Sequence, residues 1–503
     1  MPDTVLELLD RSDPSAAAIG APGRSDLTYA ELAALIGETA GALNGFGIGR
    51  NDAVAIVLPN GPEMATAFLG VAAGATAAPL NPGYREEEFE FYLTDLEARA
   101  VLVQVGEASP VRAVAERLGI GLIELQPSDG PAGGYRLQSA LAGTPKVGGM
   151  AEADDVALVL HTSGTTSRPK IVPLSQRNVC ASARQIGETL ALDRSDRCLN
   201  IMPLFHIHGL IAAVLSTAAA GGSVVCSPGF NALRFFSWLE EVQPSWYTAV
   251  PTMHQAILSR ASRNKATVDA NRLRFVRSSS SSLPPSVMAE LEETFDAPVV
   301  EAYGMTEAAH QMASNPLPPR ERKPGSVGVA AGPEVAIMNE AGDLLSVGAT
   351  GEIVIRGPNV TSGYARNPEA NAGAYQDGWF RTGDQGVLDE EGYLRITGRL
   401  KEIINRGGEK ISPREVDEVL LGHPAVAQAV AFAMPHEKLG EEVAAAVVLQ
   451  PGGTATEREI RAYASGRIAD FKVPRKIVIV DEIPKGPTGK LQRIGLAEKL
   501  GLA

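Results

Sequence analysis

The sequence contains few cysteines, and their spacing is not that of a disulfide framework or a metal site. Three cysteines occur in 503 residues, at Cys180, Cys198 and Cys226, and no two have C-x-x-C spacing. An odd and scattered set of this kind argues against a disulfide framework and against a structural zinc site. The sequence therefore predicts buried free thiols and a reducing compartment.

The chain also lacks the signals of export and of membrane insertion. Residues 1–5 (Met-Pro-Asp-Thr-Val) have no basic or apolar leader region, and the C-terminal Gly-Leu-Ala is not the peroxisomal Ser-Lys-Leu. The uncharged run 209–226 approaches the length of a membrane span, but its glycines and hydroxyl side chains favour a buried helix, turn and strand. We expect a cytoplasmic protein that does not bind a membrane.

An excess of positive charge is missing as well. Lys and Arg number 45 against 59 Asp and Glu, which gives a net charge of −14. This balance provides no long-range attraction to nucleic acid or anionic lipid, so no nucleic-acid partner is expected. An anionic ligand would have to be held by local groups. With 45% hydrophobic residues over 503 positions, the chain can bury several cores, and its length predicts about three structural units.

Hydrophobic spacing in the first half of the chain predicts alternating helices and strands. The predicted elements are helices at 29–47, 62–75 and 109–118, and short apolar strands at 54–58, 100–104 and 156–160. Strands that are apolar throughout are typical of parallel sheets covered by helices on both faces. No internal repeat of fixed period is present.

The pattern changes from about residue 325. Short alternating strands broken by glycine follow, such as 351–356 and 392–397, and they indicate a small barrel-like subdomain. The segment after the charged turn 398–402 is richer in charge. The predicted fold class is α/β, with a large N-terminal domain (1–398) of two doubly wound subdomains and a β-barrel-like subdomain, and a small α+β C-terminal domain (403–503).

A loop rich in hydroxyl groups follows the strand predicted at 156–160. Residues 162–170 read Thr-Ser-Gly-Thr-Thr-Ser-Arg-Pro-Lys. Backbone N–H groups and hydroxyls of such a loop can bind phosphate oxygens while Arg and Lys neutralise their charge. It is not a Walker A loop, because Gly-x-x-x-x-Gly-Lys is absent, and the alternative is an ordinary surface turn. The candidate phosphate ligands are Thr162, Ser163, Gly164, Thr165, Thr166 and Lys170.

The loop resembles the phosphate-binding signature of the adenylate-forming superfamily, which includes acyl-CoA synthetases, peptide-synthetase adenylation domains and firefly luciferase. Two departures, Ser167 and Ile171, stand where this superfamily usually has glycine. Five further motifs follow in the order of the superfamily: 303–307 (Tyr-Gly-Met-Thr-Glu), 378–384 (Gly-Trp-Phe-Arg-Thr-Gly-Asp), 398–402 (Gly-Arg-Leu-Lys-Glu), 406–413 (Arg-Gly-Gly-Glu-Lys-Ile-Ser-Pro) and 487–490 (Pro-Thr-Gly-Lys). The resemblance covers nearly the whole chain and implies activation of a carboxylic acid with ATP.

The resemblance implies roles at the nucleotide for residues that taken singly would be ordinary surface residues. Tyr303 would stack on adenine, Thr306 would contact the α-phosphate, and Glu307 would hold Mg²⁺, a hard cation that prefers oxygen ligands. Asp384 would accept hydrogen bonds from the ribose hydroxyls, with Arg399 nearby. The remaining residues implied for the ATP and AMP site are Ser280, Ser281, Ser282, Glu301 and Ala302.

The same resemblance implies two half-reactions and a moving C-terminal domain. Lys490 would bridge the substrate carboxylate and the α-phosphate, where a positioned cation offsets the repulsion of two anions. Lys401, in the hinge 399–402, would let the domain rotate between adenylation and thioester formation. His206 would aid attack by coenzyme A, the second substrate, or act as a gate. Arg406, Gly407, Gly408 and Lys472 would line the path of coenzyme A. The alternative for the glycine pair is the end of a helix, and both could hold.

The identity of the acid depends on a run of serines. Residues 278–282 are all serine, and with His208 and His310 they would surround the carboxylate with hydrogen-bond donors, led by Ser279 and Ser280. Segments 161–170, 246–252, 312–318 and 405–413 resemble oxalate:CoA ligases. Oxalate is therefore the expected acid, and malonate or another short acid is the alternative.

Three other interpretations remain weaker. A metal site at His206 and His208 has no third ligand with fitting spacing. A carrier-loading adenylation enzyme or a luciferase-like oxidase would need a carrier domain or an apolar pocket, and neither is visible in the sequence. A non-catalytic nucleotide-binding protein would be expected to have lost Lys490 or Glu307. The oligomeric state does not follow from the sequence.

Overall fold

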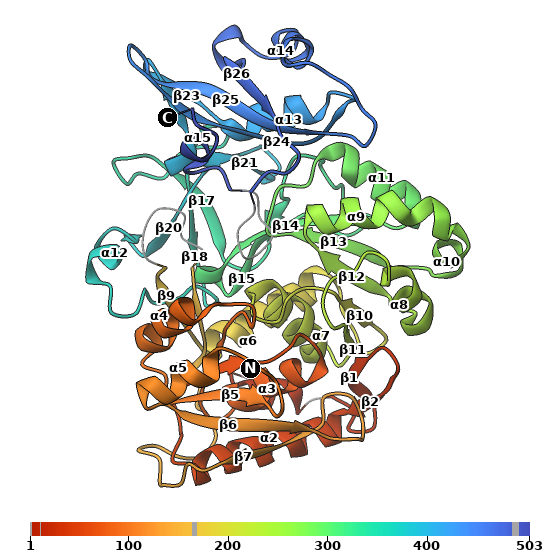
Figure 1. Cartoon of the computed structure of the whole chain (residues 1–503), viewed down its shortest axis with the longest axis vertical. Coiled ribbons are helices and arrows are strands. Elements are labelled where there is room, and N and C mark those ends of the chain that lie inside the picture. Colours follow the sequence, from red (N-terminus) through yellow and green to blue (C-terminus); the bar gives the residue numbers. More distant parts are fainter. Residues whose placement is uncertain (1–2, 11, 163–168, 485–491, 503) are drawn as a thin grey trace. The chain divides into compact units, whose positions relative to one another are not determined.

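The computed structural model describes residues 3–10, 12–162, 169–484 and 492–502 (Figure 1). They group into two compact units. The first comprises the chain up to Thr162, Pro169–Glu334 and Arg356–Tyr375, and the second comprises Val335–Ile355 and the chain from Gln376 onwards. Both units combine sheets with helices, which confirms the predicted α/β class.

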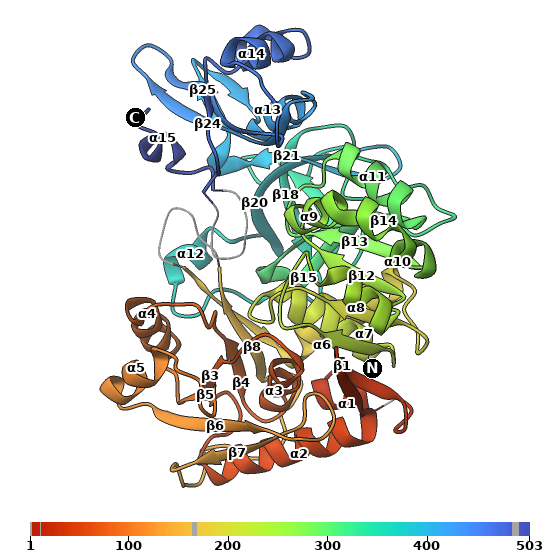
Figure 2. The same ribbon diagram turned by 45° about the vertical axis from the view of Figure 1, so that its right-hand side comes forward.

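A seven-stranded sheet organises the N-terminal part of the first unit (Figure 2). Its order is β7-β6-β5-β3-β4-β8-β9, parallel in the centre and antiparallel at both edges. Helices α4 and α5 cover the face that carries Val57 and Val101, and α3 covers the other face together with α2. The strands are β3 (Ala53–Val57), β4 (Thr76–Pro79), β5 (Ala100–Gln104), β6 (Gly121–Pro127), β7 (Tyr135–Ser139), β8 (Val156–His161) and β9 (Ile171–Ser175). The helices are α1 (Val5–Leu9), α2 (Tyr29–Gly45), α3 (Pro62–Ala72), α4 (Glu86–Leu96) and α5 (Val111–Leu118).

A nine-stranded sheet completes the first unit and carries most of the candidate site. Its order is β16-β15-β14-β13-β12-β10-β11-β1-β2, and its inner strands from β14 to β1 are parallel. Helices α8 to α11 cover one face of this sheet. Helix α6 contacts β15, the π-helix η1 contacts β10 and β15, and α7 contacts β11. The strands are β1 (Ala17–Ala21), β2 (Arg24–Thr28), β10 (Arg197–Asn200), β11 (Ser223–Cys226), β12 (Trp246–Ala249), β13 (Phe275–Ser279), β14 (Val299–Met305), β15 (His310–Ser314) and β16 (Val329–Ala330). The helices are α6 (Gln176–Thr189), η1 (His208–Leu215), α7 (Ser216–Ala219), α8 (Phe235–Val242), α9 (Pro251–Ala261), η2 (Ser262–Asn264), α10 (Lys265–Ala270), α11 (Pro285–Phe295), η3 (Thr306–Ala308) and α12 (Pro368–Ala372).

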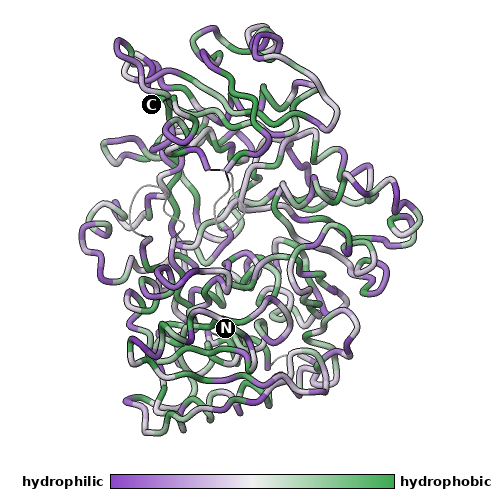
Figure 3. Tube along the Cα trace, viewed as in Figure 1, coloured by the Kyte–Doolittle hydropathy of each residue, from purple (hydrophilic) through white to green (hydrophobic). Residues whose placement is uncertain are grey.

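The apolar patterns explain these elements. Strand β3 reads Ala-Val-Ala-Ile-Val and is buried almost throughout, as expected for a parallel strand covered on both faces. The run 209–226 forms η1, α7 and β11, which confirms the predicted helix, turn and strand. In Figure 3 hydrophobic and hydrophilic stretches alternate along the tube. No helix in the described ranges is long and apolar enough to cross a membrane.

The second unit contains two five-stranded sheets. The first joins β17 (Glu334–Met338), β18 (Gly351–Arg356), β19 (Tyr375–Gln376), β20 (Trp379–Leu388) and β21 (Leu394–Arg399). The second joins β22 (Ile404–Arg406), β23 (Glu409–Ile411), β24 (Val426–His436), β25 (Gly440–Leu449) and β26 (Lys476–Ile479). The helices are η4 (Leu400–Glu402), α13 (Pro413–Leu421), α14 (Glu457–Ser465), η5 (Asp470–Lys472) and α15 (Leu496–Lys499). Helices α13 and α14 share a core with one face of the second sheet, and α15 packs with residues of its other face.

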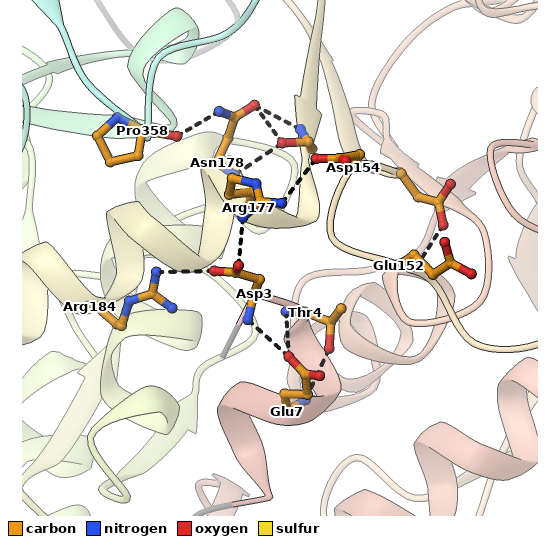
Figure 4. A network of polar contacts seen from close by, with 11 residues as sticks. Asp3, Thr4, Glu7, Glu152, Asp154, Arg177, Asn178, Arg184 and Pro358 are labelled. Atoms are coloured by element: carbon orange, nitrogen blue, oxygen red, sulfur yellow. Dashed lines mark hydrogen bonds and ion pairs between the residues drawn. The ribbon is translucent and has the colours of Figure 1, made fainter. Parts of the chain in front are cut away.

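A polar network fixes the N-terminal segment to helix α6 (Figure 4). Arg177 donates to Asp3 Oδ2 at 2.6 Å and to Asp154 Oδ1 at 3.2 Å. Asn178 donates to the backbone oxygen of Pro358 at 2.8 Å, so the same helix also holds the segment that carries Tyr364. Such exposed pairs add little stability singly, and their effect here is to place segments distant in sequence.

The three cysteines are buried and free. Cys198 and Cys226 lie in the parallel strands β10 and β11, and Cys180 lies in α6. Burial raises the pKa of Cys226 to about 12, which keeps its thiol protonated and unreactive. The predicted buried thiols are confirmed.

The buried His254 makes stability depend on pH. It lies on the buried side of helix α9, where its Nδ1 is 3.2 Å from the Tyr247 hydroxyl, and burial lowers its pKa from the ordinary 6.5 to about 3. Between these values the unfolded chain binds a proton that the folded chain does not, so stability falls as the pH falls. At one pH unit below the ordinary value the loss is about 1.4 kcal/mol.

We therefore expect His254→Gln to flatten the loss of stability between pH 7.5 and 5.5. Glutamine keeps a polar partner for Tyr247 but does not titrate. Urea unfolding at the two pH values measures the difference, with His423→Gln, at a partly exposed position, as the matched control. An unchanged pH dependence in His254→Gln would contradict the assignment.

Candidate active site

The candidate acid site lies where strand β13 ends. Parallel strands of an α/β sheet present their carboxyl ends to a ligand at one edge, and Ser279 and Ser280 stand at that end of β13. Ser280 has a φ of 71°, and His310, which begins β15, has a φ of 106°. Both lie in the left-handed region that non-glycine residues rarely adopt, so the surrounding structure holds these two side chains in place.

Arg277 lies at the centre of this cluster and is completely buried. One terminal nitrogen donates to His208 Nε2 at 3.2 Å, and the other donates to His310 Nε2 and Gln311 Oε1, each at 3.1 Å. Burial lowers the pKa of this guanidinium to about 9, which still leaves it charged near neutrality. The sequence analysis missed Arg277, although a charged residue between the apolar pair Phe275-Val276 and the serine run was a visible signal.

The two predicted acid-binding histidines are brought together. The rings of His208 and His310 stack with their centroids 5.0 Å apart. His208 Nδ1 lies 3.0 Å from Ser280 Oγ, and its Nε2 lies 2.6 Å from Thr248 Oγ1. Burial first, and then the neighbouring His310 and Arg277, hold the pKa of His208 well below its usual range, so the ring is neutral.

His206 lies beside this cluster. The Nδ1 atom of His206 accepts from the backbone N–H of His208 at 3.3 Å, because His208 opens the π-helix η1. No group of three or more metal-ligating side chains occurs among the residues that the structure describes.

Strand β14 supports the serine loop and the predicted adenine site. Ser279 Oγ donates to the backbone oxygen of Ala302 at 2.8 Å, and Glu301 Oε1 accepts from the backbone N–H of Leu283 at 3.0 Å. Ser281 and Ser282 lie between these two anchors. Tyr303 follows on the same strand and is largely buried. The loop that holds the acid candidates is therefore attached to the strand that holds the nucleotide candidates.

Glu307 is placed beside the end of the phosphate loop. It is buried in the short helix η3, directly after Thr306, and its Oε1 accepts from the Tyr364 hydroxyl at 2.9 Å. The Lys170 ammonium lies 4.3 Å from the centre of the Tyr364 ring. Tyr364, which the sequence analysis also missed, thus contacts both the predicted metal ligand and the predicted phosphate ligand. A buried carboxylate that shares a tyrosine contact with a lysine of the predicted phosphate loop fits a Mg²⁺ ion carried by ATP.

Thr162 and Lys170 close the base of the phosphate loop. The Thr162 N–H donates to the Lys170 backbone oxygen at 2.9 Å, and the Lys170 N–H donates to Thr162 Oγ1 at 3.1 Å. The intervening candidates lie outside the described residues, and so does the predicted catalytic lysine. These positions are Ser163, Gly164, Thr165, Thr166, Ser167 and Lys490.

In the second unit the predicted ribose ligand is held by an ion pair. Asp384 and Arg399 face each other across strands β20 and β21, with Arg399 Nε 2.8 Å from Asp384 Oδ1. Asp384 is largely buried, whereas the Arg399 side chain is half exposed. The arginine thus orients the Asp384 carboxylate, a group that can accept hydrogen bonds from several donors.

The predicted hinge and coenzyme A residues lie on short elements of the second unit. Lys401 is an exposed residue of the single turn η4. Gly407 and Gly408, with φ values of 58° and 98°, form the turn between β22 and β23. The alternative that they end a helix is wrong, because they connect two paired strands. Positive φ at both central positions is typical of a type I′ hairpin turn. Arg406 Nε pairs with Glu442 Oε1 at 2.6 Å, and Lys472 Nζ lies 2.8 Å from both carboxylate oxygens of Glu415.

Two family descriptions match the chain. Residues 10–365 match the AMP-binding enzyme family, and residues 415–490 match the AMP-binding enzyme C-terminal domain. The chain belongs to the AMP-binding enzyme family. The membership predicted from the ordered motifs is confirmed.

Relatives within this family cover almost the whole chain. The chain is 46% identical over 498 residues to the oxalate–CoA ligase of Arabidopsis thaliana, covering 97% of this chain and 96% of that protein. It is 44% identical over 475 residues to the oxalate–CoA ligase of Saccharomyces cerevisiae, covering 89% and 87%. Its structure is similar to that of ATP-bound MatB from Rhodopseudomonas palustris, with a TM-score of 0.89, 31% identity and 99% of both chains covered.

Proposed function

We propose that this protein is an ATP-dependent, AMP-forming acid:CoA ligase that converts oxalate to oxalyl-CoA. The ligase class predicted from the motifs is confirmed, because relatives named as CoA ligases align with this chain over nearly their whole length. The choice of oxalate is supported above all by one observation. The end of β13 gathers Ser280, His208 and His310 within hydrogen-bond reach of each other or of the buried Arg277.

The composition of this cluster fits a short and highly polar acid. A pocket for a fatty or aromatic acid is lined mainly by apolar side chains, with few polar groups. Here the Ser280 hydroxyl bonds one imidazole, and both imidazoles bond the Arg277 guanidinium. The Ser279 hydroxyl bonds the neighbouring backbone. Oxalate carries two carboxylates joined by one bond, so it needs many donors and little space.

The first half-reaction joins the acid to AMP. One oxygen of the carboxylate attacks the α-phosphorus of ATP, a new P–O bond forms, and pyrophosphate leaves. Thr162, Thr306 and Lys170 contact the phosphates in this proposal, together with the loop residues 163–166. Glu307 would hold Mg²⁺, which supplies positive charge against the phosphate oxygens when bound. Lys490 offsets the repulsion between the attacking and the attacked anions.

The nucleoside and coenzyme A are held by other residues. Tyr303 stacks on adenine, with the backbone of Glu301 and Ala302 alongside, and Asp384, oriented by Arg399, accepts from the ribose hydroxyls. In the second half-reaction the thiol sulfur attacks the acyl carbon, and AMP leaves with the oxygen of the broken C–O bond. His206 aids removal of the thiol proton. Arg406, Gly407, Gly408 and Lys472 line the path of coenzyme A, and the enzyme works in the cytoplasm.

A panel of acids tests the ligase and its substrate class. ATP–pyrophosphate exchange is measured with oxalate, malonate, acetate, octanoate and cinnamate at equal concentrations. We expect exchange with oxalate to exceed that with octanoate and cinnamate, because neither offers a second carboxylate to the donors. Absence of exchange with every acid would contradict the ligase, whereas exchange with octanoate alone would contradict only the polar pocket.

The proposed hinge gives a prediction that separates the two half-reactions. Proline fixes φ near −65°, which suits the helical turn η4 but prevents a large change of φ at residue 401. We therefore expect Lys401→Pro to lower thioester formation far more than pyrophosphate exchange. Lys401→Ala keeps the freedom of φ and serves as the control. Equal rates of both half-reactions in wild type and Lys401→Pro would place the hinge elsewhere.

A further inference from the structure

Arg277 is a buried cation with no anionic partner in the described part of the chain. Its side chain is fully buried, and none of its four hydrogen-bond partners, His208, Thr248, His310 and Gln311, is a carboxylate. Its Nε atom has no partner at all. Within the described ranges no carboxylate oxygen lies within 4.0 Å of its guanidinium nitrogens.

A second enclosed arginine shows how a protein ordinarily compensates a buried positive charge. Arg493 is also largely buried, but its Nη2 lies 2.7 Å from Asp417 Oδ2 and its Nε lies 3.1 Å from Glu402 Oε2. A buried ion is costly to desolvate unless an opposite charge and further hydrogen bonds compensate it. Arg493 has both forms of compensation within the protein, and Arg277 has only the hydrogen bonds.

The contacts of Arg277 also determine which ring nitrogen of each histidine carries the proton. A guanidinium has only donors, so each imidazole nitrogen that it contacts must offer a lone pair. Both contacts are to Nε2, and the ring protons of His208 and His310 therefore sit on Nδ1. The Nδ1–H of His208 then donates to Ser280 Oγ at 3.0 Å, which leaves the serine hydroxyl proton for a substrate oxygen.

We infer that Arg277 is the positioning residue that makes this site select a doubly charged acid. It does so by aligning His208, Ser280 and His310 as donors and by leaving one positive charge for the substrate to compensate. The inference rests on the proposed function and adds the physical basis of its substrate preference. Arg277 acts through the two histidines and not by contact with the acid.

The chemistry of the two half-reactions explains why the second charge matters. When a monocarboxylate such as acetate is adenylated, its only negative charge is lost to the new mixed-anhydride linkage. Oxalyl-adenylate keeps its second carboxylate, and so does oxalyl-CoA. A buried positive charge therefore stabilises the oxalate species through both steps but offers acetate nothing after the first bond has formed.

The test compares acids of different charge in variants at one position. Arg277→Met removes the charge and the donors while keeping a long side chain, and Arg277→Lys keeps the charge but cannot reach both histidines. The matched control is Arg272→Met, because Arg272 is highly exposed and only five residues away. For each variant kcat/KM is measured with oxalate and with acetate, together with the KM for ATP and the thermal unfolding midpoint.

We expect Arg277→Met to lower kcat/KM for oxalate by about 10²-fold, and kcat/KM for acetate by less than about threefold. Arg277→Lys should fall between Arg277→Met and wild type, and Arg272→Met should match wild type. Equal losses for both acids would show a purely structural role and would overturn the inference. If Arg277→Met does not fold, an unchanged oxalate-to-acetate ratio in Arg277→Lys would overturn it.

Failure of the proposed function would look different. In that case wild type itself would not activate oxalate. The same variants would then be compared with malonate and acetate. A fall in the malonate-to-acetate ratio would support charge selection by Arg277, and a constant ratio would refute it.

Discussion

Lys490→Ala should slow formation of the acyl-adenylate by about two to three orders of magnitude, which corresponds to roughly 3–4 kcal/mol of lost transition-state stabilisation. The physical reason is that the carboxylate and the α-phosphate repel each other as they approach, and a single positioned cation offsets that repulsion. Thioester formation from added oxalyl-adenylate should be nearly unchanged, because no second anion is attacked in that step.

The two half-reactions are measured separately, by ATP–pyrophosphate exchange and by thioester formation from synthetic oxalyl-adenylate and coenzyme A. Lys499→Ala is the matched control, since Lys499 lies close in sequence on α15 and its ammonium bonds Gln492 Oε1 at 2.7 Å. An equal loss in both half-reactions of Lys490→Ala would refute the assignment of this lysine to adenylation alone.

His310→Ala should reduce kcat/KM for oxalate by roughly 10²-fold or more. The substitution removes one of the two stacked imidazoles that bond Arg277, and truncating a partner in a buried charged hydrogen bond typically costs about 2–5 kcal/mol. The KM for ATP should hardly change. Acetate, which has no second carboxylate, should be a poor substrate in wild type that the substitution does not make worse.

Steady-state kinetics with both acids measure this effect, and His436→Ala, in the second unit, serves as the control. A variant that loses activity equally with oxalate and acetate would show that His310 supports the fold of the site. Unchanged kinetics with oxalate would remove His310 from the acid site.

Much of the fold could be predicted because the hydrophobic pattern of many segments agrees with their position in the folded protein. The strand predicted at 100–104 is β5 with the same bounds, and the helix predicted at 29–47 is α2, which ends two residues earlier at Gly45. Apolar runs of this length have few alternatives to a buried parallel strand. The motif at 303–307 was visible for a different reason, since its residues are contiguous.

The interior of the candidate site could not be predicted in the same way. Arg277 meets His310 across 33 positions of sequence, and His208 across 69. No spacing rule connects such residues. The order of strands in the sheet brings them together, and that order does not follow from the local hydrophobic periodicity. The Tyr364 contact to Glu307 spans 57 positions and was missed for the same reason. The glycine pair at 407–408 was ambiguous because hairpin turns and helix ends both favour positive φ.

The ranking of oxalate against malonate tests the central proposal most directly. Purified protein with Mg²⁺, ATP and coenzyme A is assayed for kcat/KM with each acid, and the acyl-CoA product is identified by mass. Our account predicts the higher value for oxalate, whose two carboxylates fit the donors at Ser280, His208 and His310 without additional length. A higher value for malonate, or for octanoate, would contradict oxalate as the substrate.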